Sequence, residues 1–282
     1  MTDPLVSTAW LAERLERPGL RILDGSWWMP AEGRSGHAEY LEAHIPGAVF
    51  FDIDAIADRA VDLPHMLPTP EEFAAAAGRL GLSREATIIT YDTFGIRAAA
   101  RVWWTLRVMG FTRVFVLDGG LRTWRAEGRR LEAGEAIPSP STVAPSFDAR
   151  LVRNLTEVLG LVTSHAEQIV DARGGPRFRG EVPEPRASLR SGHMPGARNV
   201  AFDGLLDADG RMKPAAALAA IFQDAGIDLD RPIVTTCGSG VTASVVALAL
   251  ARLGRDRAAV YDGSWTEWGG LADTPVATGA QA

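Results

Sequence analysis

The sequence predicts an α/β protein made of two tandem copies of one domain, each with a mainly parallel sheet flanked by helices. Two observations support this fold class. The same motifs return in the same order in both halves of the chain, and short apolar runs alternate with helical patterns within each half. Strands that alternate with helices form parallel sheets covered on both faces. A chain of 282 residues is long enough for two such domains.

The internal repeat consists of three motifs that recur at spacings of 144 to 149 residues. The pairs are Ile22-Leu23-Asp24 with Ile169-Val170-Asp171, His44-Ile45-Pro46-Gly47-Ala48 with His193-Met194-Pro195-Gly196-Ala197, and Asp118-Gly119-Gly120 with Asp262-Gly263-Ser264. The constant order indicates a duplicated domain. In both His-x-Pro-Gly-Ala pieces we expect a structural histidine that bonds the local backbone next to a turn.

A stretch rich in Pro, Ser and Ala separates the two copies, and we interpret it as an extended linker at residues 132–147. The first domain is then predicted at residues 1–131 and the second at residues 148–282. In the first copy we expect strands at 87–91 and 114–117 with a helix at 97–108 between them. In the second copy we expect strands at 233–236 and 258–261 with a helix at 241–253. Ligands of such sheets bind at the carboxyl ends of the strands.

The composition excludes several classes of partner. The formal charge of −6 and the pI near 5.5 argue against binding to nucleic acid or to an anionic membrane surface. No apolar run approaches the ~20 residues that span a bilayer. The N-terminus lacks the basic start of a signal peptide, and a single cysteine cannot form an internal disulfide, so we expect a cytoplasmic protein. The five histidines lack ligand spacing, so we expect no metal site.

The only cysteine, Cys237, follows a predicted strand and precedes a predicted helix, with Gly238 and Gly240 between them. Glycines at such a turn let several main-chain N–H groups point at one centre, and the positive end of the helix adds to their field. That environment favours the thiolate, which is the nucleophilic form of cysteine. A lone cysteine is also common as an inert core residue, but the loop around Cys237 favours a catalytic nucleophile.

The first copy carries Asp92 at the position that corresponds to the cysteine. A carboxylate cannot accept a sulfur atom, so we predict that the first domain is catalytically inactive.

The tandem domains, the degenerate first loop and the sequence Cys237-Gly238-Ser239-Gly240-Val241-Thr242 resemble the two-domain rhodanese superfamily. Within that superfamily, the loop resembles the 3-mercaptopyruvate sulfurtransferases, whereas thiosulfate sulfurtransferases carry basic residues at the positions of Gly238 and Ser239. The resemblance covers nearly the whole chain. It includes His65-Met66-Leu67-Pro68, Arg101-Val102-Trp103-Trp104 and Leu117-Asp118-Gly119-Gly120-Leu121. It implies two tandem rhodanese-like domains.

The resemblance implies transfer of sulfane sulfur from 3-mercaptopyruvate through a persulfide on Cys237, with release of pyruvate. The acceptor would be a thiol, such as that of a thioredoxin, or cyanide, and no cofactor is needed. The resemblance maps the substrate-binding pair onto Arg177 and Arg186, whose guanidinium groups suit a carboxylate. Loop residues Gly238, Gly240, Val241 and Thr242 would also bind the substrate. The alternative for the arginines is surface pairing with Glu181 and Glu184, which contributes little.

The resemblance also suggests a relay of Asp54, His65 and Ser239. In it, His65 held by Asp54 would orient the Ser239 hydroxyl toward the keto oxygen of the substrate. The alternative for His65 is a loop histidine bonded to backbone.

Three other functions stay open. The nearest is thiosulfate:cyanide sulfurtransferase, which the uncharged Gly238 and Ser239 disfavour. A phosphatase would need arginine at the sixth position after the cysteine, where this chain has Ala243. A non-enzymatic sulfur carrier or thiol sensor would release no pyruvate over several turnovers.

Overall fold

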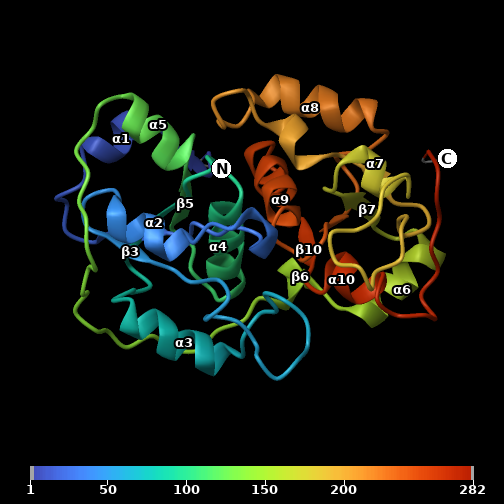
Figure 1. Cartoon of the computed structure of the whole chain (residues 1–282), viewed down its shortest axis with the longest axis horizontal. Helices are drawn as coiled ribbons and strands as arrows, with labels where there is room; N and C mark the ends of the chain where they lie inside the picture. Colours follow the sequence, from blue (N-terminus) through green and yellow to red (C-terminus); the bar gives the residue numbers. More distant parts are fainter. Residues whose placement is uncertain (1–2, 281–282) are drawn as a thin grey trace. The chain divides into compact units, whose positions relative to one another are not determined.

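The structure is a computed structural model that describes residues 3–280 (Figure 1). The chain packs as two compact units. The first comprises the residues up to Arg59, Leu67–Asp148 and Asp207–Met212. The second comprises Ala60–Met66, Ala149–Leu206 and the residues from Lys213 on. Within residues 3–280 no helix is both long and apolar enough to cross a membrane.

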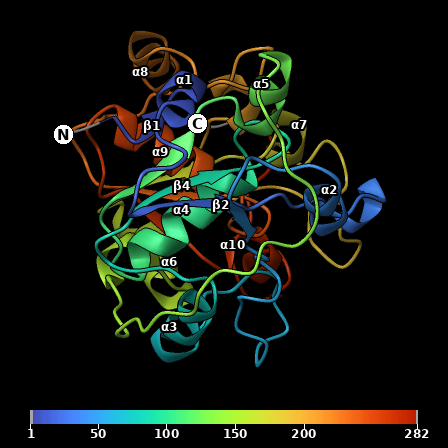
Figure 2. The same ribbon diagram turned by 90° about the vertical axis from the view of Figure 1, so that its left-hand side faces the viewer.

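The first unit holds five strands with helices between them. Its elements are β1 (Leu5–Val6), α1 (Thr8–Ala12), β2 (Leu20–Asp24), η1 (Pro30–Glu32), α2 (Gly36–Glu42), β3 (Ala48–Phe50), α3 (Pro70–Arg79), β4 (Thr87–Tyr91), α4 (Ala98–Val108), β5 (Val114–Leu117) and α5 (Gly120–Ala126). Its strands lie in the order β1-β5-β4-β2-β3, and every pair is parallel. Figure 2 shows β2 and β4 side by side at the centre of this sheet.

The second unit repeats the arrangement. Its elements are η2 (Ala149–Leu151), β6 (Val152–Arg153), α6 (Leu155–Ser164), β7 (Gln168–Asp171), α7 (Gly175–Phe178), β8 (Arg198–Asn199), η3 (Phe202–Leu205), α8 (Ala215–Asp224), β9 (Ile233–Thr236), α9 (Ala243–Arg252), β10 (Ala259–Tyr261) and α10 (Ser264–Trp268). The strand order β6-β10-β9-β7-β8 matches the first sheet strand for strand, and every pair is parallel. The predicted fold class is therefore confirmed, with helix and strand ends within a residue or two of expectation.

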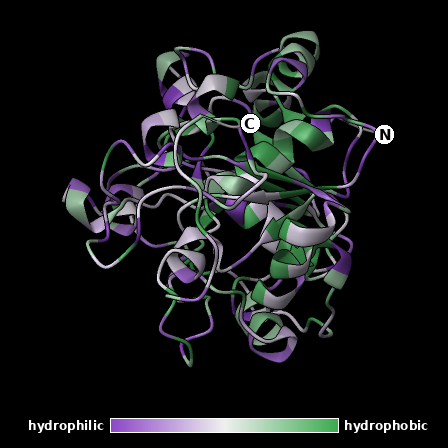
Figure 3. Ribbon diagram, turned by 90° about the vertical axis from the view of Figure 1, so that its right-hand side faces the viewer, coloured by the Kyte–Doolittle hydropathy of each residue, from purple (hydrophilic) through white to green (hydrophobic). Residues whose placement is uncertain are grey.

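The core of each unit forms where apolar strands meet one strongly buried helix. Helix α4 packs against β4 and β5, and α9 packs against β9 and β10. Most residues of both helices are buried, as their Ala-, Val- and Leu-rich sequences require. In Figure 3 the strands are mainly coloured as hydrophobic, whereas hydrophilic stretches fall mostly on the connecting loops. The packing of these helices therefore stabilises each sheet. The loops at the carboxyl ends of its strands are the segments that can carry a functional site.

Two short segments cross between the units, which the predicted boundaries at 131 and 148 did not include. Ala60–Met66 packs with the second unit and Asp207–Met212 with the first. His65, which we had assigned to the first domain, therefore belongs to a segment of the second unit. The stretch at 132–147 contains no helix and packs on the first unit, where Ser141 N donates to Gly78 O at 2.9 Å. The domain boundaries themselves stay a proposal.

The repeated histidines hold the backbone in both units. His44 Nδ1 lies 2.8 Å from Tyr40 O, and His193 Nδ1 lies 2.8 Å from Phe178 O. Both rings are buried, and each residue also forms an isolated antiparallel bridge with a distant segment. The expected structural role of these histidines is confirmed.

The strand-end carboxylates differ between the two units. Asp24 at the end of β2 and Asp171 at the end of β7 are both buried, and each accepts a hydrogen bond from the main-chain N–H two residues later. Asp171 is also paired with the guanidinium of Arg173, whereas Ser26 holds the equivalent position in the first unit. Asp24 is buried without such a cation, and its burial raises its pKa from 3.8 to about 6. Hydrogen bonds from Ser26 and Tyr91 offset part of this increase in the pKa.

We predict that Asp24→Asn stabilises the first unit above pH 6. In the unfolded chain Asp24 ionises near pH 4, so its ionisation weakens the fold as the pH rises from about 4 to about 6. The change in pKa from 3.8 to about 6 corresponds to roughly 2–3 kcal/mol of unfolding free energy at neutral pH. Urea unfolding at pH 4 and pH 7.5 measures the gain, with exposed Asp209→Asn as the control. Equal stability of the variant and the wild type at pH 7.5 would contradict the prediction.

Candidate active site

Cys237 lies at the carboxyl end of β9, directly after the strand, and the loop at 238–242 leads into α9. Its side chain is buried. Its main-chain N donates to Ser264 Oγ at 3.2 Å, and its carbonyl accepts from Trp265 N at 2.9 Å. Gly240 adopts a left-handed φ of 78° that lets the chain turn into the helix. The predicted sequence of strand, cysteine, glycine loop and helix is confirmed.

The loop after Cys237 presents main-chain N–H groups that no protein acceptor uses. Among the described residues, none of the N–H groups of residues 238–242 donates a hydrogen bond. The N-terminus of the ten-residue helix α9 follows at once. Donors of this kind at a helix N-terminus favour negative charge on a thiolate or on an anion bound next to it.

The first unit shows where such N–H groups point. Asp92 Oδ1 accepts from Gly95 N, and Asp92 Oδ2 accepts from Arg97 N and Ala99 N, each at 2.8 Å. The spacing of 145 residues between Asp92 and Cys237 places Gly240 and Thr242 at the positions of Gly95 and Arg97. The first loop thus closes on its own carboxylate, whereas the second presents a thiol.

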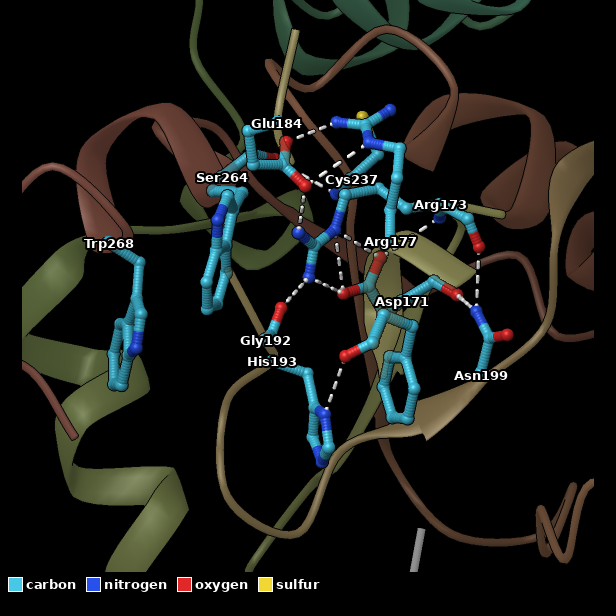
Figure 4. Close-up of polar contacts among 12 residues, drawn as sticks. Asp171, Arg173, Arg177, Glu184, Gly192, His193, Asn199, Cys237, Ser264 and Trp268 are labelled. Carbon is cyan, nitrogen blue, oxygen red and sulfur yellow. Dashed lines mark hydrogen bonds and ion pairs between the residues drawn. The ribbon is translucent and has the colours of Figure 1, made fainter. Parts of the chain in front are cut away.

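Four charged side chains form a continuous network next to Cys237 (Figure 4). Arg173 is buried and donates to both carboxylate oxygens of Asp171, to Glu184 Oε1 at 2.9 Å and to Gly192 O at 2.8 Å. Its guanidinium lies 4.1 Å above the Trp265 ring. Burial alone would lower the pKa of Arg173, but Asp171 and Glu184 outweigh it and raise the pKa above its ordinary value.

Arg177 connects this network to the cysteine loop. Its Nε and Nη2 donate to Glu184 Oε1 and Oε2 at 3.1 and 2.5 Å. Its Nη2 lies 3.3 Å from the point that a Cβ on Gly238 would occupy, so a side chain at position 238 would crowd the guanidinium. In Figure 4 the Cys237 sulfur lies behind the Arg177 guanidinium. The arginine side chain is 29% exposed, which leaves it able to meet a ligand.

Arg179 and the predicted binding residue Arg186 are not members of this network. Arg179 pairs with exposed Glu181 at 2.7 Å. Arg186 is half-buried, and its guanidinium forms no hydrogen bond or ion pair with a described residue. Glu184, which we had considered as a surface partner of these arginines, is instead buried, with 1% of its side chain exposed.

The residues of the suggested relay are distributed over both units. Asp54 belongs to the first unit, where Trp27 Nε1 donates to its Oδ2 at 2.8 Å. His65 and Ser239 are buried in the second unit, and His65 has a left-handed φ of 61°. Of the remaining loop residues, Val241 is buried and Thr242 is the N-cap of α9. The relay itself stays a prediction.

Sequence reasoning missed Ser264, which lies in the repeated Asp-Gly-Ser/Gly motif. Ser264 Oγ accepts from Cys237 N and donates to Tyr261 O at 2.8 Å. Ser264 has a left-handed φ of 50°, and the equivalent Gly120 has a φ of 53°. The motif was visible, but only the backbone geometry shows that a serine here accepts strain of ~1–2 kcal/mol to place its hydroxyl at the cysteine.

We predict that Ser264→Gly slows the reaction at Cys237 roughly fivefold to tenfold, because the Cys237 N–H loses its acceptor. The glycine relieves the left-handed strain, so the unfolding free energy should stay within about 1 kcal/mol of wild type. Ser264→Ala keeps the strain and should lose about 1–3 kcal/mol in addition to the activity. Steady-state rates and urea unfolding measure both effects. A fully active glycine variant would show that the hydroxyl does not position the cysteine.

Comparison with known proteins supports one family. The Rhodanese-like domain family matches residues 7–127 and 154–271. A 3-mercaptopyruvate sulfurtransferase from Escherichia coli K12 is 44% identical and aligns over 98% of both chains. A mitochondrial thiosulfate/3-mercaptopyruvate sulfurtransferase from Arabidopsis thaliana is 44% identical over 98% of this chain and 78% of its own. The crystal structure of SseA from Escherichia coli superposes with a TM-score of 0.86 at 42% identity, covering 94% of this chain and 99% of that one. The chain therefore belongs to the rhodanese-like family, as a sulfurtransferase with two rhodanese-like domains.

Proposed function

We propose that this enzyme moves sulfane sulfur from 3-mercaptopyruvate to a thiol acceptor through a persulfide on Cys237. The observation that carries the proposal is the loop at 238–242, whose N–H groups have no acceptor among the described residues, while the Arg177 guanidinium lies against Gly238. That arrangement combines a thiolate-favouring cradle with a cation suited to the carboxylate of a small keto acid. The names of the relatives agree with 3-mercaptopyruvate as the sulfur donor.

The chemistry follows from these groups. The Cys237 thiolate attacks the thiol sulfur of the donor, a new S–S bond forms, and the carbon–sulfur bond breaks. The electron pair leaves as pyruvate enolate, and the proton of the donor thiol ends on the methyl carbon of pyruvate. Cys237 holds the transferred sulfur as a persulfide anion, which the N–H groups of Gly240 and Thr242 are positioned to stabilise by analogy with Gly95 and Arg97 in the first unit.

We propose that different residues bind the carboxylate and the keto oxygen of the donor. Arg177, held by Glu184, and Arg186 form the proposed carboxylate clamp. Ser239 is buried two residues after Cys237, and its hydroxyl is proposed as the donor to the developing enolate oxygen. His65 and Asp54 would orient that hydroxyl, a role that rests on the family resemblance.

The second half-reaction delivers the outer sulfur to an external thiol such as that of a thioredoxin, or to cyanide. Because Cys237 is the only cysteine of the chain, no second thiol of the protein competes for the sulfur. A free catalytic thiol suits a reducing compartment, and the cytoplasm is our proposal, although one relative is mitochondrial. Asp92 in the closed first loop supports a first domain without catalysis of its own.

Two rival functions fit the site less well. A cysteine phosphatase needs an arginine six residues after the nucleophile, and Ala243 at that position is a buried residue that begins α9. Thiosulfate as the main donor would require cationic groups at Gly238 and Ser239, although the names of three relatives include thiosulfate.

We predict that Cys237→Ser abolishes turnover and leaves the fold intact, because a serine alkoxide is scarce near neutral pH and cannot form the S–S bond. The wild-type chain should gain about 32 Da, the mass of one sulfur atom, when it is incubated with 3-mercaptopyruvate alone. Intact-mass spectrometry and pyruvate release measure the two steps. Substantial turnover by Cys237→Ser would overturn the proposed function, and pyruvate release over many turnovers separates an enzyme from a sulfur carrier.

A second prediction concerns Ser239. Ser239→Ala should lower kcat/KM for 3-mercaptopyruvate more than for thiosulfate, because only the keto acid leaves as an enolate that needs a hydrogen-bond donor. Loss of one such donor costs on the order of 10²–10³ in rate when nothing replaces it. The ratio of kcat/KM for the two donors is the measurement, with Ser244→Ala, whose buried hydroxyl bonds Gly240 O, as the control. An unchanged ratio in Ser239→Ala would remove the relay from the mechanism.

A further inference from the structure

Glu184 is the residue that links the substrate-facing arginine to the buried interior. Both of its oxygens are engaged, Oε1 by Arg173 and Arg177 and Oε2 by Arg177. Only 1% of its side chain is exposed. A carboxylate held by several charge-assisted hydrogen bonds is fixed in place. Glu184 is therefore held at one position in the network next to Cys237.

The charges of this network cancel. Arg173 and Arg177 contribute two positive charges, and Asp171 and Glu184 contribute two negative charges, so the network sums to zero. Arg186, the other arginine of the proposed clamp, has no ion-pair partner among the residues that the structure describes. Glu184 is therefore the carboxylate that offsets the charge of Arg177, whereas no described carboxylate offsets the charge of Arg186.

We propose that Glu184 is a specificity determinant, which offsets the charge of Arg177 so that the site favours a monoanionic sulfur donor over a dianionic one. This inference rests on the proposed function, since it concerns the donor of that reaction. A 3-mercaptopyruvate molecule near pH 7 carries one negative charge, on its carboxylate, whereas thiosulfate carries two. The second charge of thiosulfate is repelled by Glu184 without an additional cation in the loop to compensate.

The size of the effect follows from Coulomb's law. One extra unit of charge at about 8 Å from Glu184, at an effective dielectric constant near 20–40, changes the interaction by enough to alter a rate or binding constant roughly fivefold to thirtyfold. Neutralising Glu184 should therefore move the donor preference by a measurable factor without making thiosulfate the better donor.

The first test compares Glu184→Gln with Glu181→Gln. Glu181 lies three residues away and pairs with Arg179 at 2.7 Å, but it is exposed, so its charge is screened by solvent. In Glu184→Gln the ratio of kcat/KM for thiosulfate to that for 3-mercaptopyruvate should rise roughly tenfold. In Glu181→Gln the ratio should stay at the wild-type value. An unchanged or lower ratio in a folded Glu184→Gln variant overturns the proposal.

Two further variants separate charge from position. Glu184→Asp keeps the charge and shortens the side chain, so both donors should be used more slowly at a nearly unchanged ratio. Arg177→Gln removes a positive charge from a partly exposed side chain, so the ratio should fall, and this variant tests the proposal even if Glu184→Gln does not fold. Equal increases of the ratio in Glu184→Gln and Glu184→Asp would assign the effect to geometry. Loss of both donors in a folded Glu184→Gln variant would leave Glu184 a positioning residue only.

Alkylation tests the same charge without any sulfur donor. Because Cys237 is the only cysteine, the rates of its reaction with anionic iodoacetate and neutral iodoacetamide report the potential at this one sulfur. The iodoacetate-to-iodoacetamide ratio should rise several-fold in Glu184→Gln and stay constant in Glu181→Gln. A wild-type chain that forms no persulfide with 3-mercaptopyruvate would refute the proposed function, whereas an alkylation ratio that Glu184→Gln leaves unchanged would refute the charge assignment.

Discussion

In each sheet, the loop after the central strand leads into a buried helix whose first N–H groups need a hydrogen-bond acceptor. The chemistry of each unit depends on which group accepts these hydrogen bonds. Helices α4 and α9 are buried over most of their length, so solvent cannot freely hydrate their N-termini. In the first unit the Asp92 carboxylate accepts three of these N–H groups. In the second unit the Cys237 side chain has no oxygen atom that could accept these hydrogen bonds. We propose that an anion formed on its sulfur, or carried in by the substrate, accepts hydrogen bonds from these N–H groups.

This constraint also explains the ion network next to the cysteine. A loop of free N–H groups and the arginine that we propose to bind the substrate would together attract anions strongly, and buried charge without a partner is costly. Arg173 is held on both sides by Asp171 and Glu184, so its buried guanidinium is fully engaged. Glu184 then fixes Arg177, whose rotamers would otherwise be free at the surface. The interior thus orients Arg177 against Gly238 and limits the charge that it brings.

The sequence alone was sufficient for the fold and for the arrangement of strand, glycine loop and helix around Cys237. The repeat, the period of the strands and helices, and the glycines around Cys237 are local signals, and the structure confirms the elements that they predicted. The burial of Glu184 could not be predicted from such local signals. Its segment looks like an exposed loop of alternating charges, and only the packed structure distinguishes it from Glu181, three residues earlier, which is exposed. The crossing segments 60–66 and 207–212 escaped prediction for the same reason, since contacts between distant residues leave no periodic signal.

Ser264 shows how the two copies diverged on an unchanged backbone. The left-handed conformation at this position is common to both units, and the first unit meets it at no steric cost with Gly120. A Cβ on Gly120 would lie only 2.4 Å from Asp92 O, so the closed loop requires glycine there. In the second unit a side chain is present, its hydroxyl accepts the N–H of Cys237, and the same backbone is strained. A serine at this position thus places a strained residue next to Cys237, whereas glycine at the same position of the first unit adopts the conformation without strain.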